Sequence, residues 1–162
     1  MANFFRRSKK MEVYSFADGK VKDLVLVPDQ VFSQGHVGRG IAVVPTDSLI
    51  TSPVDAKVAM IFPTRHALGL VCSSGVEIML HIGIDTVELK GEGFEVLVKE
   101  GQQVKVGQPL LNVDFDYIAS KGLPTDCLCI MTSPLSDGVV EYTQSNDDEV
   151  IKGETVLFRF KQ

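Results

Sequence analysis

The chain has no tryptophan, only three cysteines and only three histidines among its 162 residues. Cys127 and Cys129 are separated by one residue, which is not the CxxC spacing of redox or zinc motifs. The first eleven residues are too short and too charged for a secretory or transmembrane segment. An odd number of cysteines without such a segment favours a reducing compartment. We therefore expect a cytoplasmic protein whose cysteines, including Cys72, are structural.

Charge is unevenly distributed. The chain carries a net charge of −5, and the four cations of its first ten residues leave −9 for the remainder. An acidic body argues against nucleic-acid binding and favours a basic protein partner. We expect a flexible basic tail over residues 1–12, in which Phe4 and Phe5 could make weak contact with a membrane surface. A solvated terminus is the alternative.

Short apolar runs separated by turn residues predict an all-β domain over residues 13–162, with at most short helical turns. Segments of the chain also resemble one another. Residues 51–58 are similar to residues 132–139 and, more weakly, to residues 16–21; residues 104–110 are similar to residues 150–156. Recurrent turn–strand units of this kind predict an internally duplicated antiparallel β-sandwich or flattened barrel.

Two of the three histidines lie in residues 61–91. In an extended chain Phe62, Thr64 and His66 would leave one face together, and so would Met79 and His81. Ile78, Leu80 and Ile82 would then point to the opposite face. A turn at residues 73–75 would return the chain antiparallel and bring the two imidazoles side by side.

Paired neutral imidazoles on a dry face suit few kinds of chemistry. One ring could accept a phosphoryl group while the other donates a hydrogen bond to its oxygens. The pair could also bind zinc, since histidine nitrogen is a good zinc ligand. A third alternative is that both are core histidines hydrogen-bonded to the backbone.

A resemblance to a known family rests on the same residues. The run P-T-x-H-A at residues 63–67, followed by H-I-G-I-D-T-V-E-L-K-G-E-G-F at residues 81–94, resembles the glucose-family enzyme IIA of the bacterial phosphoenolpyruvate-dependent sugar phosphotransferase system. The resemblance implies a cytoplasmic all-β phosphocarrier that takes phosphate from HPr and passes it to the IIB domain of a sugar permease. It implies that His81 is the nucleophile through Nε2, that His66 binds the phosphoryl oxygens, and that Thr64 holds the His66 ring.

The resemblance also implies a surface that partners contact, on which Asp85 could pair with an incoming arginine. A turn carboxylate is the alternative role for Asp85. His36 occupies a variable position at the rim of this surface. The predicted partner-binding residues are Asp29, Val31, Phe32, Val37, Phe62, Leu68, Met79, Asp85 and Val87. For Phe32, Phe62, Leu68, Met79 and Val87 the alternative is an ordinary core position, and we expect one or two of them to be core.

Two other functions compete with the phosphocarrier. The same face could belong to a regulatory module that binds target proteins without obligatory phosphate transfer. A zinc hydrolase of related fold would need an H-x-H pattern, and this chain has none, since Leu68 and Gly83 stand two residues after His66 and His81. We therefore expect no required cofactor, although His66 and His81 could bind zinc incidentally.

Overall fold

A computed structural model describes residues 10–134 and 138–161. Strands dominate this part of the chain, and its helices are short. The helical segments are α1 (Gln30–Ser33), α2 (Phe115–Ser120) and the 3-10 turns η2 (Leu24–Leu26) and η3 (Thr86–Leu89). The strands are β1 (Lys10–Tyr14), β2 (Gly19–Lys22), β3 (Arg39–Pro45), β4 (Leu49–Thr51), β5 (Ala56–Ile61), β6 (Ala67–Val71), β7 (Glu77–Ile82), β8 (Phe94–Val96), β9 (Gln103–Val104), β10 (Pro109–Val113), β11 (Cys127–Met131), β12 (Val140–Tyr142), β13 (Glu149–Val150) and β14 (Val156–Lys161).

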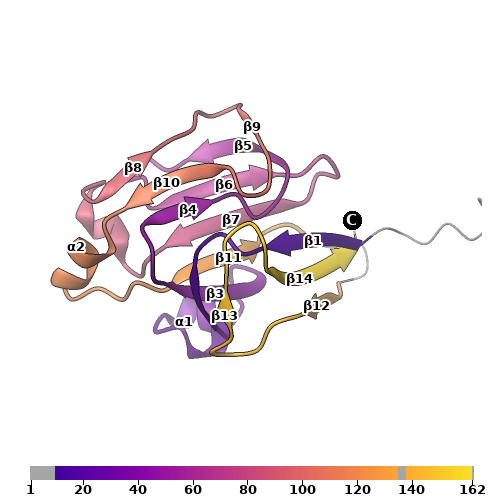
Figure 1. Ribbon diagram of the computed structural model, residues 1–162, viewed down its shortest axis with the longest axis horizontal. Coiled ribbons are helices and arrows are strands. Elements are labelled where there is room, and N and C mark those ends of the chain that lie inside the picture. Colours follow the sequence, from indigo (N-terminus) through magenta and orange to yellow (C-terminus); the bar gives the residue numbers. More distant parts are fainter. Residues whose placement is uncertain (1–9, 135–137, 162) are drawn as a thin grey trace, which may run out of the picture.

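These strands form one large antiparallel sheet and two small ones (Figure 1). The large sheet has eight strands in the order β13-β2-β3-β11-β7-β6-β5-β9. The small sheets have three strands each, in the orders β1-β14-β12 and β4-β10-β8. The prediction of an antiparallel all-β sandwich is confirmed.

The order of strands shows that the fold consists of two similar halves. The large sheet shows the same arrangement when it is followed inward from either edge. From one edge the order is β13, β2, β3, β11, and from the other edge it is β9, β5, β6, β7. A pseudo-two-fold axis therefore passes between β11 and β7. The small sheets match in the same way, with β14 and β10 each in the middle. The second half, β4 to β10, is therefore inserted in the chain between β3 and β11 of the first half.

Reciprocal backbone hydrogen bonds join the halves. The N–H of Tyr14 donates to the carbonyl of Pro53, and the N–H of Thr51 donates to that of Phe16, both at 2.9 Å. The structure thus pairs residues 51–58 with residues 16–21, which were the weaker of the two sequence matches to that segment. The other copy, residues 132–139, includes residues 135–137, which lie outside the described part. The predicted duplication of turn–strand units is confirmed.

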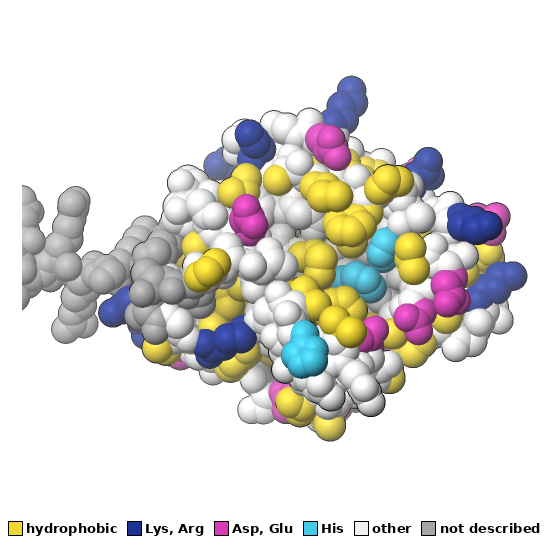
Figure 2. Space-filling view, turned by 180° about the vertical axis from the view of Figure 1, so that it is seen from behind, with side chains coloured by type: hydrophobic (Ala, Val, Ile, Leu, Met, Phe, Trp, Pro, Cys, Tyr) yellow, Lys and Arg dark blue, Asp and Glu magenta, His cyan; other side chains and the backbone are white. Residues whose placement is uncertain are grey.

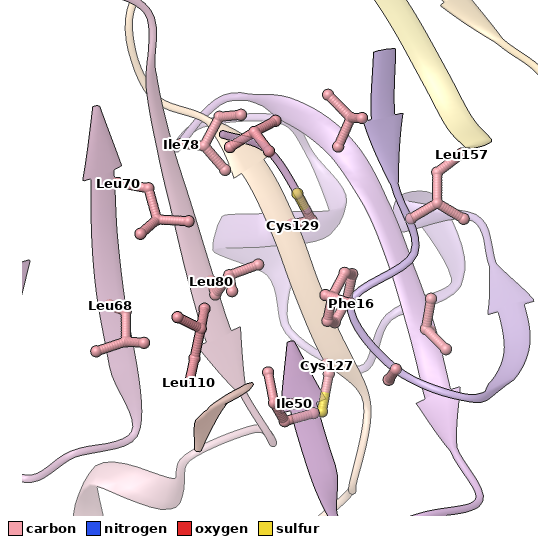
Figure 3. Close-up of a cluster of buried hydrophobic side chains, with 14 of the residues drawn as sticks. Phe16, Ile50, Leu68, Leu70, Ile78, Leu80, Leu110, Cys127, Cys129 and Leu157 are labelled. Carbon is pink, nitrogen blue, oxygen red and sulfur yellow. The ribbon is translucent and has the colours of Figure 1, made fainter. Parts of the chain in front are cut away.

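The main core lies between the large sheet and the small ones. Figure 3 shows Leu68, Leu70, Ile78 and Leu80 pointing into it from neighbouring strands, opposite Phe16, Ile50 and Leu110. Ile78, Leu80 and Ile82 point inward as the alternation of β7 predicted. All three cysteines are free and buried, and burial raises the pKa of Cys72 to about 11 and that of Cys127 to about 12.

The first strand begins three residues before the boundary predicted for the N-terminal tail. Strand β1 begins at Lys10 and pairs with β14 in register from Lys10↔Lys161 onward, because Met11 and Val13 pack toward the core. Residues 1–9, which hold the remainder of the predicted tail, lie outside the described part. Among the described residues, no helix is long and apolar enough to cross a bilayer.

A second, smaller apolar cluster covers the outer face of the large sheet. Segment 24–37, with η2 and α1, places Val27 and Phe32 over Ala42 of β3 and over Leu128 and Ile130 of β11. Met79 of β7 packs against the edge of this cluster. In the first half the outer face is thus largely covered, and beyond Met79 the second half presents its outer face to solvent.

Candidate functional site

His81 lies on β7 and points outward at the edge of the covered region. Its neighbours in the sheet are Ala67 of β6 and Leu128 of β11. Alternation places Met79 on the same face of β7 as His81. The position of His81 follows from the strand pattern alone.

His66 does not lie in a strand, contrary to the prediction. It closes the turn between β5 and β6, in which Arg65 adopts a left-handed conformation (φ 59°). The carbonyl of His66 accepts the N–H of Ile82 at 2.8 Å, so its backbone extends the ladder between β6 and β7. The turn carries the His66 ring over the sheet toward His81.

The two imidazoles meet edge to face. Their ring centroids are 5.0 Å apart with an interplanar angle of 81°. Aromatic rings flank the pair, with the Phe32 centroid 4.8 Å from that of His81 and the Phe62 centroid 5.6 Å from that of His66. The predicted convergence of both histidines is therefore present, and apolar groups surround it.

A hydrogen bond fixes each ring through its Nδ1 atom. Nδ1 of His66 lies 2.7 Å from Oγ1 of Thr64. Nδ1 of His81 lies 2.8 Å from the carbonyl oxygen of Gly83. A carbonyl oxygen only accepts, so Nδ1 of His81 carries the proton and Nε2 holds the lone pair. His81 is thus prepared to act as a nucleophile through Nε2.

Burial keeps both rings neutral. It lowers the pKa of His66, and it lowers the pKa of His81 to about 4, assisted by the neighbouring His66. The Gly83 carbonyl and the carboxylates of Asp29 and Asp85 oppose this shift only in part. A neutral imidazole with a free Nε2 is therefore the ground state at neutral pH.

Sequence comparisons identify the family to which this geometry belongs. The pattern of the phosphoenolpyruvate-dependent sugar phosphotransferase system, EIIA 1, matches residues 11–136. The chain is 38% identical over 147 residues to a glucose-specific EIIA component of Staphylococcus epidermidis, covering 91% of this chain and 87% of that protein. The chain belongs to the EIIA family.

Two further relatives agree with this assignment. A glucose-specific EIICBA component of Staphylococcus carnosus is 41% identical over 145 residues, which are 90% of this chain but 21% of that larger protein. The solved structure of glucose permease IIA from Mycoplasma capricolum superimposes with a TM-score of 0.86 at 35% identity, covering 93% of this chain and 96% of that one. This EIIA is a phosphocarrier component of the sugar phosphotransferase system, a role that implies contact with HPr and with a IIB domain.

The predicted partner-binding residues of this EIIA are accessible or pack on the histidines, with one exception. Figure 2 shows two adjacent histidine side chains ringed by hydrophobic ones, with acidic side chains to one side. Val31 and Val87 are 52% and 50% exposed, and Phe32 is buried against His81. The remaining members are partly or fully accessible: Asp29, Val37, Phe62, Met79 and Asp85.

The exception is Leu68, which is fully buried in the main core. The prediction placed Leu68 on the apolar partner surface, with an ordinary core position as the alternative. After the turn at Arg65, Leu68 pairs with Leu80 and points inward with it.

The two acidic residues near His81 are held differently. Asp29 caps α1, its Oδ1 accepting the N–H of Val31 at 2.9 Å. Asp85 precedes η3 in a left-handed conformation and makes no capping hydrogen bond with its side chain. Its exposed carboxylate is therefore available at the rim of the site.

The described residues contain no group of three or more His, Cys, Asp or Glu side chains arranged to hold a metal ion. His36 is exposed at the end of the α1 segment and does not complete such a group with His66 and His81. Incidental binding of zinc by the histidine pair stays a prediction.

Sequence reasoning overlooked two contributors to the site. It did not anticipate that the Gly83 carbonyl sets the tautomer of His81, nor that Thr86 holds the turn that carries Gly83. The run G-I-D-T at residues 83–86, directly after the strand that carries His81, was the available signal. A backbone contact of this kind depends on dihedral angles, which side-chain patterns do not report.

Proposed function

We propose that Nε2 of His81 accepts a phosphoryl group from phospho-HPr and passes it to the IIB domain of a glucose-family sugar permease. The observation that supports this most directly is the 2.8 Å contact between Nδ1 of His81 and the carbonyl of Gly83. It leaves the lone pair of Nε2 free, while burial keeps the ring neutral at neutral pH. The glucose-specific names of the relatives support the choice of permease family.

His66 and Thr64 assist in this proposal. If the Thr64 hydroxyl donates to Nδ1 of His66, the proton of that ring lies on Nε2 and can be donated to a phosphoryl oxygen. The transition state of phosphoryl transfer is loose, so positioning and charge stabilisation supply most of the catalysis. The ring contact of 5.0 Å places this donor beside the proposed nucleophile.

The transfer needs no cofactor. The lone pair of Nε2 forms the new N–P bond as the bond between phosphorus and the donor breaks, and the His81 proton stays on Nδ1. The apolar rim, with Val31, Met79 and Val87, excludes water from this bond exchange. The carboxylates of Asp29 and Asp85 give the rim a negative charge that suits basic partners. We infer that the transfer takes place in the cytoplasm.

Intact-mass measurement after incubation with phosphoenolpyruvate, enzyme I and HPr tests this proposal. The unmodified protein should gain one acid-labile phosphoryl group, and His81→Ala should gain none. His66→Ala should accept the group slowly and pass it on poorly, while His36→Ala, which alters the exposed third histidine, should behave as the unmodified protein. Phosphorylation of His81→Ala, or none of the unmodified protein, would overturn the proposal.

A further inference from the structure

The carbonyl that orients His81 belongs to a tight turn over residues 82–86. Gly83 has φ +75° and Asp85 has φ +59°, so two of its residues are left-handed. The N–H of Ile84 donates to the carbonyl of Pro124 at 3.0 Å, which fastens the middle of the turn to the segment before β11. Since the Asp85 side chain makes no capping bond, another group must close the turn.

That group is the side chain of Thr86, which is fully buried. Its hydroxyl donates to the carbonyl of Ile82 at 2.6 Å, across the turn. Its methyl carbon fills the space beside Gly83, where an added Cβ would collide with it. Thr86 thus holds the turn both by a hydrogen bond and by packing.

The peptide groups that Thr86 secures bear on both histidines. The N–H of Ile82 donates to the carbonyl of His66 at 2.8 Å, and the carbonyl of Gly83 accepts Nδ1–H of His81 at 2.8 Å. Along the backbone, the Ile82 carbonyl lies between that N–H and the Gly83 carbonyl, and it is the group that the Thr86 hydroxyl binds. A buried carbonyl that loses its partner costs free energy. Rotation of its peptide group toward another donor would relieve that cost and would carry Gly83 with it.

We propose that Thr86 is a positioning residue that determines which nitrogen of His81 takes the phosphoryl group. This inference rests on the proposed function of His81. With the Gly83 carbonyl in place, the ring proton stays on Nδ1 and the lone pair of Nε2 forms the N–P bond. Once the carbonyl moves away, the tautomer with the proton on Nε2 becomes accessible. Its Nδ1 lone pair then forms the N–P bond as the donor bond breaks, leaving the proton on Nε2.

The experiment compares Thr86→Val with Thr86→Ser. Valine keeps the shape but removes the hydroxyl, and serine keeps the hydroxyl but removes the methyl. Thr51→Val is the matched control, because Thr51 is a buried threonine in β4 whose hydroxyl has no partner. Phosphorus NMR separates Nδ1- from Nε2-phosphohistidine after phosphorylation through HPr, and nitrogen NMR of the unphosphorylated protein reports the His81 tautomer.

We expect only Nε2-phosphohistidine in the unmodified protein, in Thr51→Val and in Thr86→Ser. Thr86→Val should contain a measurable share of the Nδ1 isomer and of the Nε2–H tautomer. It should also accept phosphate roughly three- to tenfold more slowly, the effect of losing one hydrogen bond of ordinary strength. If Thr86→Val does not fold, Thr86→Ala removes the same hydroxyl without the added bulk and is measured in its place.

The outcomes separate this inference from the proposed function. If His81 of the unmodified protein takes no phosphoryl group, the proposed function fails. If the unmodified protein carries Nε2-phosphohistidine and the variant without the hydroxyl shows the same isomer, tautomer and rate, only the role of Thr86 is overturned. A slower rate with an unchanged tautomer and isomer would also overturn it, because a purely structural role predicts that result.

Discussion

Gly107 and Gly153 lie against each other across the pseudo-two-fold axis: a Cβ built on Gly153 would stand 3.2 Å from the Cα of Gly107. Each glycine closes the same turn in its own half. The N–H of Gly107 donates to the carbonyl of Ser52, and that of Gly153 donates to the carbonyl of Ser15, both at 2.9 Å. The two duplicated turns therefore support one another by direct backbone contact.

Gly153→Ala should destabilise the protein through this contact. Alanine is strained at φ +76° and its Cβ presses on Gly107. Gly101→Ala is the control, because Gly101 has φ +87° and open space around its added Cβ. The control should cost about 1 kcal/mol of unfolding free energy from backbone strain, and Gly153→Ala at least about 1 kcal/mol more. Equal losses in denaturant titrations would show that the glycine contact contributes nothing.

The rate of phosphoryl acceptance should depend on pH through His81. Its pKa lies near 4, below the ordinary 6.5, chiefly because the ring is buried. Only the neutral ring has a lone pair at Nε2, so acceptance should stay constant through 6.5 and fall only as the pH approaches about 4. Single-turnover mixing with prephosphorylated HPr measures this, with the pH dependence of HPr determined separately. A midpoint near 6.5 would show that the ring is not protected from water.

The free energy of unfolding should also depend on the protonation of His81. The unfolded chain binds a proton at His81 near pH 6.5 and the folded protein only near 4, so the unfolded state binds more protons between these values. The free energy of unfolding should therefore decrease as the pH falls through that window. His81→Ala should lose this part of the pH dependence when both proteins are titrated with urea. An identical dependence in the two proteins would contradict the depressed pKa.

Phe32→Ala should alter His81 without touching either proposed catalytic nitrogen. The Phe32 ring is 8% exposed and covers His81, so its removal admits water and should raise the pKa of His81 toward the ordinary value. The loss of packing should cost about 3 kcal/mol, at the low end for a buried phenylalanine because the cluster is small. NMR titration measures the pKa, and Val31→Ala on the same helix serves as the control.

Leu68→Ala and Val87→Ala should separate the core from the partner surface. Leu68 is fully buried, and its truncation should cost about 3 kcal/mol in unfolding free energy. Val87 is 50% exposed, and its truncation should change stability by less than about 0.5 kcal/mol. Val87→Ala should slow transfer from phospho-HPr while remaining as stable as the unmodified protein, and Leu68→Ala should not combine these two properties. A loss of stability at Val87 would place it in the core.

Much of the fold was accessible from the sequence because strands impose a strict period on their side chains. The alternation around His81 assigned Ile78, Leu80 and Ile82 to the core, and the structure agrees. The left-handed residue Arg65 shifts the parity of the chain, so Leu68, which was predicted on the partner surface, points into the core. Alternation holds only within an uninterrupted strand.

The all-β class, the internal duplication and the two histidines as the centre of the chemistry could be predicted from the sequence, because periodicity, repeats and rare residue types are local properties. The remaining features required the folded chain. It brought His66 from a turn to within ring contact of His81, covered His81 with Phe32, and placed the carbonyl of Gly83 on Nδ1. These features depend on backbone dihedral angles and on contacts between distant segments, and both are decided only when the chain packs.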